Sequence, residues 1–379
     1  MARRLRYTVE GDDVEPYLKG LIERIYHHLF IQVHTKAEIR DFSGYVGNFR
    51  TTLETGERRT SVDIPHGVAV VATGAREFRP DEYLYGRDDR VLTHLELEAE
   101  IYASSDRIQS CRSLVMIQCV GSRDAQRPYC SRVCCGQAVK NAVRLKKINP
   151  EMKIYVLYRD MRTYGLMENV YGDAAERGVV FIRYHEADKP EVQVNDAGFQ
   201  VTVTEPTLGQ KLMLQADLLS LAAATIPPED NHVLSQALKI PLNADGFFME
   251  AHMKLRPVDF PTDGIFMCGL AHGPKGISES IAQGHAAASR AMTVLSREEM
   301  LGEAAIARVD SLKCTGCAVC GSVCPFHAVE VDDELGTAVV NSALCKGCGL
   351  CAASCRSGAL DVMGNNEAQV FSLLLALSN

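Results

Sequence analysis

The chain of 379 residues is long enough for two or three domains with sizeable cores, and its 46% hydrophobic content is ordinary for a globular protein. Its 40 basic and 48 acidic residues give a net charge of −8, which argues against nucleic acid as the main partner. No apolar stretch approaches the length that spans a bilayer, and no apolar segment follows the basic start MARRLRY as it would in a signal peptide.

The first 230 residues or so alternate between helical and strand-like patterns. Apolar residues recur at helical spacing over 14–29 and alternate as in strands over Ile31–Glu54. Strand–helix alternation of this kind predicts an α/β fold with a doubly wound parallel sheet. Its short apolar runs, typical of buried parallel strands, lie at 67–74, 114–119, 154–158 and 179–182, and the helical patterns between the later runs lie at 136–147 and 166–177.

A further strand at 265–268 leads through Gly269 into an Ala-rich helix over Ile277–Leu295. A strand that meets a helix through glycine is typical of an anion site at the helix N-terminus. No G-x-G-x-x-G follows any predicted strand, so the phosphate-cradling fingerprint of a dinucleotide domain is missing. The charged, Ala-rich stretch Ser296–Ala307 is predicted to join this part of the chain to the C-terminal module.

Two cysteine runs near the C-terminus share the spacing C-x2-C-x2-C-x3-C. This is the spacing of a bacterial-type ferredoxin with two 4Fe–4S clusters, in which the fourth cysteine of each run binds the other cluster. Zinc and disulfides are the alternatives, but zinc usually takes two C-x2-C pairs, which does not explain three ligands followed by x3. The first cluster is expected to bind Cys314, Cys317, Cys320 and Cys355, and the second Cys345, Cys348, Cys351 and Cys324. Since no signal peptide precedes them, the 14 Cys favour redox or metal use in a cytoplasmic protein.

A second cysteine group has the spacing C-x10-C-x3-C-C and is formed by Cys119, Cys130, Cys134 and Cys135. The spacing alone leaves scattered thiols and a shared metal both open, although the adjacent Cys134 and Cys135 are awkward as a disulfide. Three nearby arginines would lower the pKa values of the thiols and stabilise an anionic cluster; they are Arg123, Arg127 and Arg132. The leftover Cys111 and Cys268 are expected to be small buried apolar residues.

Several unusual motifs occur along the chain in a distinctive order. They are Ser43–Phe49, Val70–Gly74, Tyr85-Gly86 with Val91–Thr93 and Leu95-Glu96, Gln118–Asp124, Tyr129–Cys135, Tyr158–Gly165 and Gly269–Lys275. This order resembles the flavin subunit of heterodisulfide reductase, together with the related flavin subunits of quinone-interacting oxidoreductase complexes. The resemblance extends from about Tyr17 to near the C-terminus.

The resemblance implies a thioredoxin-reductase-like core that binds FAD, interrupted by a second nucleotide-binding-like lobe and followed by the two-cluster ferredoxin. The FAD-binding domain would take 1–105 and 229–300, the lobe 106–228, the ferredoxin domain 304–364, and a C-terminal helix or tail 365–379. A third 4Fe–4S cluster would bind the four cysteines of the second group. The FAD contacts would come from Gly74, Gly269, Lys275, Gly276 and Ile277.

The sequence departs from the family in two ways. The FAD fingerprint is missing, as though the gene started downstream or the front half were a separate polypeptide, and the interval 50–67 is too short for the additional ferredoxin that longer members insert there. A cation at Lys275 would stabilise a reduced flavin, and a solvated loop lysine is the alternative.

The function that follows is electron transfer between a flavin and 4Fe–4S clusters, as an oxidoreductase subunit of a heterodisulfide-reductase-like complex. The family implies partners of the hydrogenase, dehydrogenase or disulfide-reducing type, and a separate chain would supply the fingerprint. The alternative is a ferredoxin-type electron-wiring module on a scaffold that no longer binds flavin. A third interpretation, a small subunit like that of glutamate synthase, fits less well because its clusters lie at the other end of the chain. The apolar stretch Phe371–Leu377 is expected to be a docking face and not an anchor.

Overall fold

The computed structural model describes residues 4–56, 59–195, 198–299, 305–364 and 366–377. The chain divides into two compact units. The first contains the described residues of Met1–Asp41, Thr52–Asp63 and Ala69–Arg290, and the second those of Phe42–Thr51, Ile64–Val68 and Ala291–Asn379. The expected domain boundaries at 300, 304 and 365, and the middle of the expected joint over 296–307, lie outside the described residues.

The larger unit is built around a parallel sheet of five strands in the order β6-β13-β7-β8-β9. Three of these strands coincide with apolar runs predicted from the sequence. The domain boundary expected at residue 105 would separate β6 from the other strands of this sheet, although β6 pairs with β13. The strands are β6 (Val91–Thr93), β13 (Leu218–Ala223), β7 (Ser113–Val120), β8 (Lys153–Tyr158) and β9 (Val180–Arg183).

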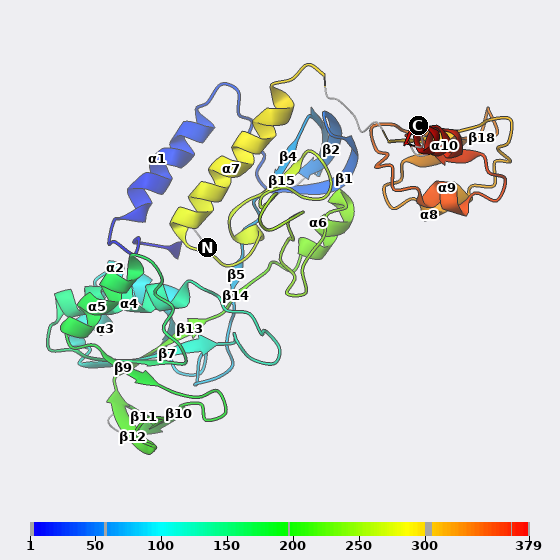
Figure 1. Ribbon diagram of the computed structural model, residues 1–379. Coiled ribbons are helices and arrows are strands. Elements are labelled where there is room, and N and C mark those ends of the chain that lie inside the picture. Colours follow the sequence, from blue (N-terminus) through cyan, green and yellow to red (C-terminus); the bar gives the residue numbers. More distant parts are fainter. Residues whose placement is uncertain (1–3, 57–58, 196–197, 300–304, 365, 378–379) are drawn as a thin grey trace. The chain divides into compact units, whose positions relative to one another are not determined.

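Helices cover one face of this sheet (Figure 1). Because successive side chains of a strand point to opposite faces, Leu114 and Met116 of β7 pack into the core beneath the helices. The first helix begins with a capping box, in which Thr93 and Glu96 each accept a hydrogen bond from the other's backbone amide. The helices are α2 (His94–Tyr102), α3 (Asp106–Ser110), α4 (Cys134–Ile148) and α5 (Met167–Glu176).

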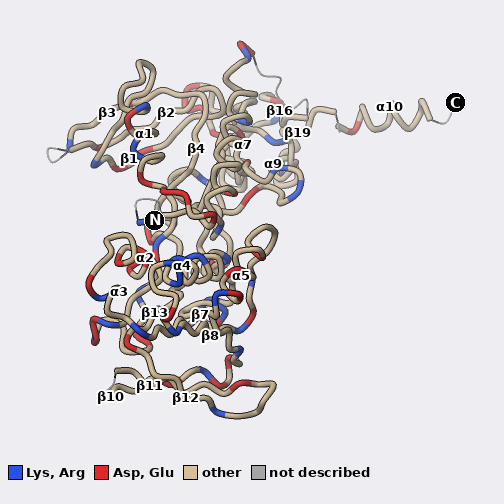
Figure 2. Tube along the Cα trace, turned by 90° about the vertical axis from the view of Figure 1, so that its left-hand side faces the viewer, with Lys and Arg blue, Asp and Glu red and all other residues tan. Residues whose placement is uncertain are grey.

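The opposite face of the sheet is covered by a second, antiparallel sheet (Figure 1 and Figure 2). Val115 and Ile117 of β7 point to this side, where they join a core with the fully buried Phe199 and Val201. Burying side chains of this size contributes about 1.5–3 kcal/mol each. The α/β fold class is therefore confirmed, while the strand–helix alternation did not indicate a β layer on this face. Its strands are β10 (Glu191–Asn195), β11 (Gly198–Glu205) and β12 (Gln210–Ala216).

The remaining strands before residue 270 form small sheets, and β1, β2 and β3 are divided between the two units. β4 pairs in parallel with β15, with Val71 opposite Met267, so the chain segments that follow both strands leave the same edge. The predicted strand at 67–74 is shorter in the structure, the predicted helix at 14–29 ends at Tyr26, and the predicted helix Ile277–Leu295 has those bounds. These elements are β1 (Ala37–Tyr45), β2 (Asn48–Thr55), β3 (Thr60–His66), β4 (Ala69–Val71), β5 (Arg76–Glu77), β14 (Thr225–Ile226), β15 (Ile265–Met267), α1 (Val14–Tyr26), α6 (Asn231–Leu238), the 3₁₀ helix η2 (Gly269–Ala271) and α7 (Ile277–Leu295).

The cysteine-rich end of the chain forms two antiparallel strand pairs and two short helices that contact each other. Its small core consists of apolar side chains together with cysteines such as Cys320 and Cys351. This is the α+β architecture predicted for the C-terminal domain. The elements are β16 (Ala307–Val309), α8 (Val319–Val323), β17 (Val329–Asp332), β18 (Thr337–Val340), α9 (Leu350–Ser354) and β19 (Leu360–Val362).

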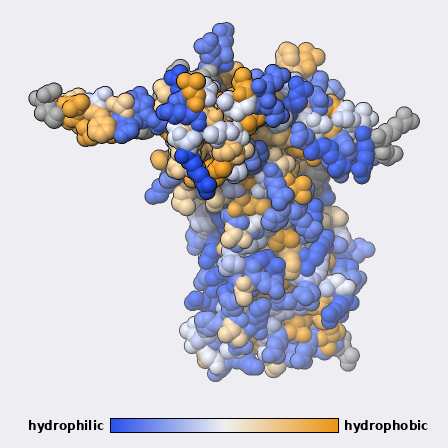
Figure 3. Space-filling view, turned by 90° about the vertical axis from the view of Figure 1, so that its right-hand side faces the viewer, coloured by the Kyte–Doolittle hydropathy of each residue, from blue (hydrophilic) through white to orange (hydrophobic). Residues whose placement is uncertain are grey.

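The last helix, α10 (Glu367–Leu377), carries the apolar stretch that the sequence marks as a docking face. Its large apolar side chains are exposed, among them Phe371 and Leu374, and they form an apolar surface along the helix (Figure 3). Within the described part of the chain, every helix is too short or too polar to cross a lipid bilayer.

Candidate metal centres and the glycine turn before α7

The four cysteines of the C-x10-C-x3-C-C group line one cavity of the larger unit. Cys119 lies near the end of β7, and the connection to α4 supplies Cys130, with Cys134 and Cys135 opening the helix. The cavity is thus at the carboxyl end of a parallel strand, where open α/β sheets usually bind their ligands.

The backbone around this cavity is strained and leaves polar groups directed at sulfur. Cys119, Arg123 and Arg132 have φ values of 62°, 58° and 58°, a left-handed conformation that L-residues rarely adopt. Val133 gives α4 no side-chain cap, so the helix N-terminus beside the thiols keeps its partial positive charge. The amide of Arg132 donates to Cys130 Sγ at 3.3 Å. The helix N-terminus and the Arg132 amide favour an anionic group at this position, and strained backbone of this kind clusters at functional sites.

Two of the three expected arginines, Arg123 and Arg132, line this cavity, whereas Arg127 does not. The Arg123 guanidinium lies 4.0 Å from Cys119 Sγ and 2.6 Å from Asp160 Oδ2. Arg127 instead lies over the ring of Phe78, 4.0 Å from its centre, and the Arg132 side chain points to α7. The motif Tyr158–Gly165 contributes Arg162 to the cavity wall, which the sequence did not assign to this site.

Burial outweighs the effect of Arg123, which acts on the pKa of Cys119 in the expected, lowering direction, and the pKa values of three of these thiols are raised. Burial raises the pKa of Cys119, although Arg123 opposes it, and raises that of Cys135 to about 11. The pKa of Cys134 is raised well above its usual value by burial and by the neighbouring thiols Cys135, Cys119 and Cys130. Desolvation by burial is the largest cause for all three thiols and exceeds the effect of the arginines.

In the cysteine-rich unit, the two runs are related by an internal repeat of 31 residues. A backbone amide donates to sulfur at 3.3 Å at four equivalent places, from Ala338 to Cys314, Ala307 to Cys345, Ala328 to Cys324 and Ala359 to Cys355. Such bonds stabilise the charged form of a ligating sulfur. Both runs are therefore built to hold the same kind of group.

The fourth cysteine of each run lies beside the other run. One cavity is lined by Cys314, Cys317 and Cys320 of the first run together with Cys355 of the second. In the second set, the thiols of Cys345, Cys324 and Cys348 lie close enough to Cys351 to affect its pKa. Burial raises the pKa of Cys351, and these neighbouring thiols raise it further. The structure thus brings together the two sets of four cysteines expected from the crossover pattern.

Close backbone approaches explain two of the glycines in these runs. A Cβ on Gly316 would lie 2.6 Å from the carbonyl oxygen of Gly336, and one on Gly347 would lie 1.9 Å from that of Ala305. Both glycines also have left-handed φ values, of 65° and 62°. No other residue would fit without displacing the backbone that carries the amide donors.

The expected flavin residues lie around the turn between β15 and α7 and at the end of β4. Gly74 and Gly269 have positive φ values of 77° and 66° and follow strands that pair with each other. Lys275 Nζ donates to the carbonyl oxygens of Gly269 and Gly273 at 2.7 and 2.8 Å. Lys275 is only 7% exposed, so it is not a solvated loop lysine.

The N-terminus of α7 already has an acidic partner. Glu279 Oε2 accepts from the amide of Gly276 at 3.0 Å, one residue before Ile277 opens the helix. His272, which the sequence left without a role, bonds Glu250 and Gln283 and supports the same turn. Burial lowers the pKa of Lys275 to about 8, with Arg132 acting in the same direction. A bound anion at this turn would have to compete with the Glu279 carboxylate.

Neither group of sites resembles a single-ion centre. Over the described residues, no three His, Cys, Asp or Glu side chains converge as they would around one metal ion. A zinc ion draws four sulfurs to about 2.3 Å, whereas a cubane spreads its four ligands over the corners of a cluster. Four cysteine thiols in each cavity are the donor set that a 4Fe–4S cluster takes.

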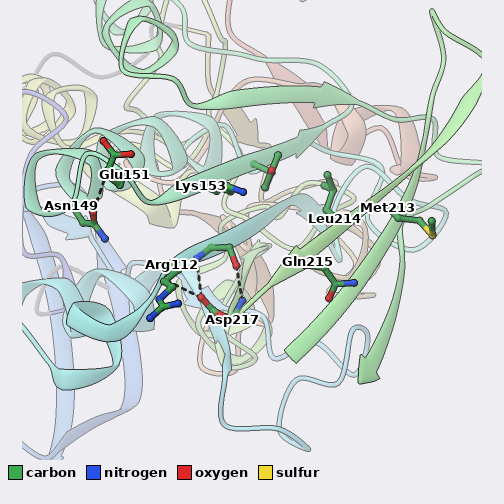
Figure 4. Close-up of a pocket in the computed structure, with 10 residues that line it drawn as sticks. Arg112, Asn149, Glu151, Lys153, Met213, Leu214, Gln215 and Asp217 are labelled. Atoms are coloured by element: carbon green, nitrogen blue, oxygen red, sulfur yellow. Dashed lines mark hydrogen bonds between the residues drawn. The ribbon is translucent and has the colours of Figure 1, made fainter. Parts of the chain in front are cut away.

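A more open cavity of about 670 Å³ lies elsewhere in the larger unit, at the amino ends of β7 and β8 (Figure 4). Asp217 accepts hydrogen bonds there from the amides of Arg112 and Ser113, which ties β13 to β7. Its wall holds no cysteine, and it lies at the strand ends opposite the thiols. We therefore do not count it as part of the redox site.

The leftover cysteines differ from each other. Cys111 is buried, as expected, and burial raises its pKa to about 12. Cys268 is only half-buried and lies near Lys275, whose charge opposes the rise in its pKa that burial causes. The expectation of a fully buried residue is wrong for Cys268.

Comparisons with known proteins concern the C-terminal domain and the chain as a whole. A family model described as a 4Fe-4S dicluster domain matches residues 306–369. The chain is 38% identical over 301 residues to the A subunit of the H(2):CoB-CoM heterodisulfide,ferredoxin reductase of Methanothermobacter marburgensis, covering 75% of this chain and 45% of that protein. It is 41% identical over 270 residues to an iron-sulfur A subunit of the CoB--CoM heterodisulfide reductase of Methanopyrus kandleri, covering 68% and 41%. The chain thus spans less than half of the length of these relatives.

Among solved structures, the chain is similar to thioredoxin reductase from Lactococcus lactis, with a TM-score of 0.49 and 15% identity, over 76% of this chain and 82% of that one. The T. acidophilum thioredoxin reductase has a TM-score of 0.46 and 12% identity, over 76% and 81%.

Proposed function

We propose that this chain, a homologue of the A subunit of heterodisulfide reductase over 75% of its length, is an electron-transfer subunit of a redox complex of that type. It would pass electrons between a flavin and 4Fe–4S clusters and on to partner subunits. The observation that carries this proposal is the gathering of twelve cysteines in three groups of four, two of them with the crossover of a two-cluster ferredoxin.

Each group of four cysteines would bind one cluster. We assign one ferredoxin cluster to Cys314, Cys317, Cys320 and Cys355, the other to Cys345, Cys348, Cys351 and Cys324, and a third cluster to Cys119, Cys130, Cys134 and Cys135. Bound iron–sulfur clusters supply one-electron carriers, and their number is the part of this assignment that needs measurement.

The chain's own groups would set how readily each site accepts an electron. In the ferredoxin unit, four backbone amides directed at sulfur favour the more negative state. At the third site, burial opposes added negative charge while the Arg123 guanidinium beside Cys119 favours it. Exposure also differs, because Cys317 and Cys348 are exposed whereas Cys135 is buried.

The flavin is the less complete part of the proposal. Gly74, Gly269, Lys275, Gly276 and Ile277 would line the flavin, and Lys275 would supply a cation next to it. The residues present do not make a complete dinucleotide site, because the phosphate-binding fingerprint is missing and Glu279 occupies the Gly276 amide. We therefore propose that this chain alone binds FAD weakly and that a partner chain or an extended N-terminus carrying the fingerprint restores binding.

The same observations favour one alternative function. A chain without a usable flavin site would be an electron-wiring module that carries electrons between partner subunits through its clusters alone. A visible spectrum of the anaerobically purified protein, recorded after the clusters are removed, separates the two functions. Flavin bands that appear only with the partner chain would support the proposal. Tight one-to-one FAD in the single chain would contradict the proposed weak binding. Absence of flavin under both conditions would favour the electron-wiring module.

The cluster assignment is tested by an iron count on the full reconstituted chain. Three cubanes correspond to roughly twelve irons and two to roughly eight. Changing Cys134 and Cys135 together to Ser should remove about four irons and leave the paramagnetic resonance signals of the ferredoxin clusters unchanged. Cys111→Ser is the matched control, because this buried thiol belongs to none of the groups and should change no iron. A count near eight in the wild-type chain would return the four residues to structural thiols.

A further inference from the structure

One side chain connects the cysteine cavity directly to the turn before α7. Arg132 lies between Cys130 and Cys134, and its guanidinium donates to Glu279 Oε1 at 2.7 Å and to the carbonyl oxygen of Pro274 at 3.3 Å. Its backbone amide meanwhile donates to Cys130 Sγ. A single residue therefore contacts a cysteine sulfur with its backbone and the Gly269–Ile277 turn with its side chain.

A tyrosine from a third segment completes this contact. Arg132 donates to the Tyr164 hydroxyl at 3.2 Å, and that hydroxyl in turn donates to Glu279 Oε2 at 3.2 Å. The Arg132 guanidinium also lies 5.7 Å from the centre of the Tyr164 ring. Tyr164 belongs to the Tyr158–Gly165 motif, whose Asp160 and Arg162 line the cysteine cavity. This motif thus contributes to both ends of the connection.

Glu279 is the point where the two regions meet. One of its oxygens takes the Arg132 guanidinium, and the other takes the Gly276 amide at the start of α7. Desolvation raises the pKa of Glu279, but the hydrogen bond from the Gly276 amide, followed by those from Arg132 and Tyr164, holds it below its usual value, so the carboxylate stays charged. The pair is 42% and 37% exposed, so its ion-pair energy alone is small and its geometric role is the larger one.

Two residues just before Arg132 anchor the cysteine loop to β14, so a bound cluster would fix the segment that follows this anchor. Ser131 is fully buried and its hydroxyl accepts from the amide of Thr225 at 2.9 Å, and the Tyr129 hydroxyl donates to the Thr225 carbonyl oxygen at 2.9 Å. Arg132 itself has the left-handed φ of 58°. A change in the cysteine loop therefore has few ways to relax locally, and the Arg132 side chain offers it a path to α7.

We propose that Arg132, Tyr164 and Glu279 are positioning residues that couple occupation of the Cys119, Cys130, Cys134 and Cys135 site to order in the Gly269–Ile277 turn. The inference rests on the proposed third cluster. Binding of a cluster fixes the cysteine loop, the fixed loop holds Arg132, and Arg132 holds Glu279 on the Gly276 amide. The flavin-facing turn is then ordered only when the neighbouring electron carrier is in place.

Amide hydrogen exchange on the full chain tests this coupling. Peptides covering 129–136 and 269–280 are compared between the cluster-free and the anaerobically reconstituted protein. In the wild-type chain, reconstitution should slow exchange in both peptides by about fivefold or more, the lower end of typical coupling between sites. Glu279→Gln keeps an acceptor for the Gly276 amide but loses the ion pair, and its reconstitution should slow exchange only in 129–136.

Two further variants keep the test decisive. Tyr164→Phe removes the bridging hydroxyl and should reduce the effect in 269–280 without affecting 129–136. Asp173→Asn in α5 breaks the Arg177–Asp173 pair, which has a similar exposure of 38% and 39% but connects no sites, and it should behave as wild type. A purely local capping role for Glu279 would change exchange in 269–280 equally with and without iron.

The outcomes are distinct. Slower exchange in 129–136 with no change in 269–280 of the wild-type chain would overturn the coupling, while the assignment of the third cluster would stand. A coupled response that persists in Glu279→Gln would overturn the role of the ion pair. An iron count near eight with no response in either peptide would overturn the third cluster and the coupling together.

Discussion

The two glycines beside cluster cysteines, Gly316 and Gly349, allow a test of what fixes the ferredoxin backbone. Both have left-handed φ values, of 65° and 77°. A Cβ on Gly316 would lie 2.6 Å from the Gly336 oxygen, whereas one on Gly349 would meet only a Val362 methyl group at 3.8 Å. The repeat already tolerates a side chain at the position equivalent to Gly349, because Ala318 occupies it with a φ of 60°.

The expected cost differs between Gly316→Ala and Gly349→Ala. The left-handed conformation costs an L-residue roughly 1–2 kcal/mol in either variant, partly offset by about 0.4–1 kcal/mol from a less flexible unfolded chain. Ordinary contact begins at 3.4 Å, so Gly316→Ala must also move the Gly336 oxygen by about 0.8 Å (3.4 − 2.6). Overpacking of this kind costs about 1–3 kcal/mol. Weakening the nearby bond from the Ala338 amide to Cys314 would add about 1 kcal/mol. Gly316→Ala should therefore be less stable than Gly349→Ala by about 2–4 kcal/mol.

The assay follows loss of cluster absorption in guanidinium under anaerobic conditions. Both variants are made in the Cys134→Ser and Cys135→Ser background, so that the ferredoxin clusters dominate the signal. Gly349→Ala should lose its clusters near the denaturant concentration of the parent, and Gly316→Ala at a clearly lower one. Equal midpoints for the two variants would refute the reasoning, since close backbone approach is the only difference between the two positions that enters it.

Two more predictions follow from the same structure. Cys320→Ser and Cys355→Ser should disturb one cluster and Cys324→Ser the other, and paramagnetic resonance of the reduced protein would expose an error if Cys320→Ser and Cys324→Ser affected the same signal. Burial lowers the pKa of Lys275 from 10.5 to about 8, so between these pH values the unfolded chain binds a proton that the folded chain does not. The free energy of unfolding of the wild-type chain should therefore rise with pH across this window relative to that of Lys275→Met, by at most about 3 kcal/mol. The same difference in free energy of unfolding between the two proteins at pH 8 and at pH 10 would contradict this prediction.

Much of this protein was predictable from short stretches of sequence. Cysteine spacing predicts the two C-terminal groups because three cysteines separated by two residues each can bind one and the same cluster. The structure brings those cysteines together as expected. Hydrophobic periodicity predicts α7 with its observed bounds and the strands β7, β8 and β9 within a few residues, because it reflects which face of a single element is buried.

Other features depend on contacts between residues far apart in the chain. The β10–β12 layer packs Phe199 against Val115, a partnership that no local pattern specifies. The arginines were misjudged for the same reason, since nearness in sequence put Arg127 among the cysteines, whereas folding turns it onto Phe78 and brings Arg162 to the cavity wall.

The connection through Glu279 is the clearest case. The sequence marks Tyr158–Gly165 as a motif and Ile277–Leu295 as a helix, but it contains no local signal that Tyr164 and Glu279 meet at Arg132. These residues are separated by 32 and 147 positions from Arg132, and only the packing of the sheet, its crossover helix and the turn before α7 brings them together. Ligand spacing is a local property and can be read along the chain, whereas a hydrogen-bonded connection between sites exists only once the tertiary fold has formed.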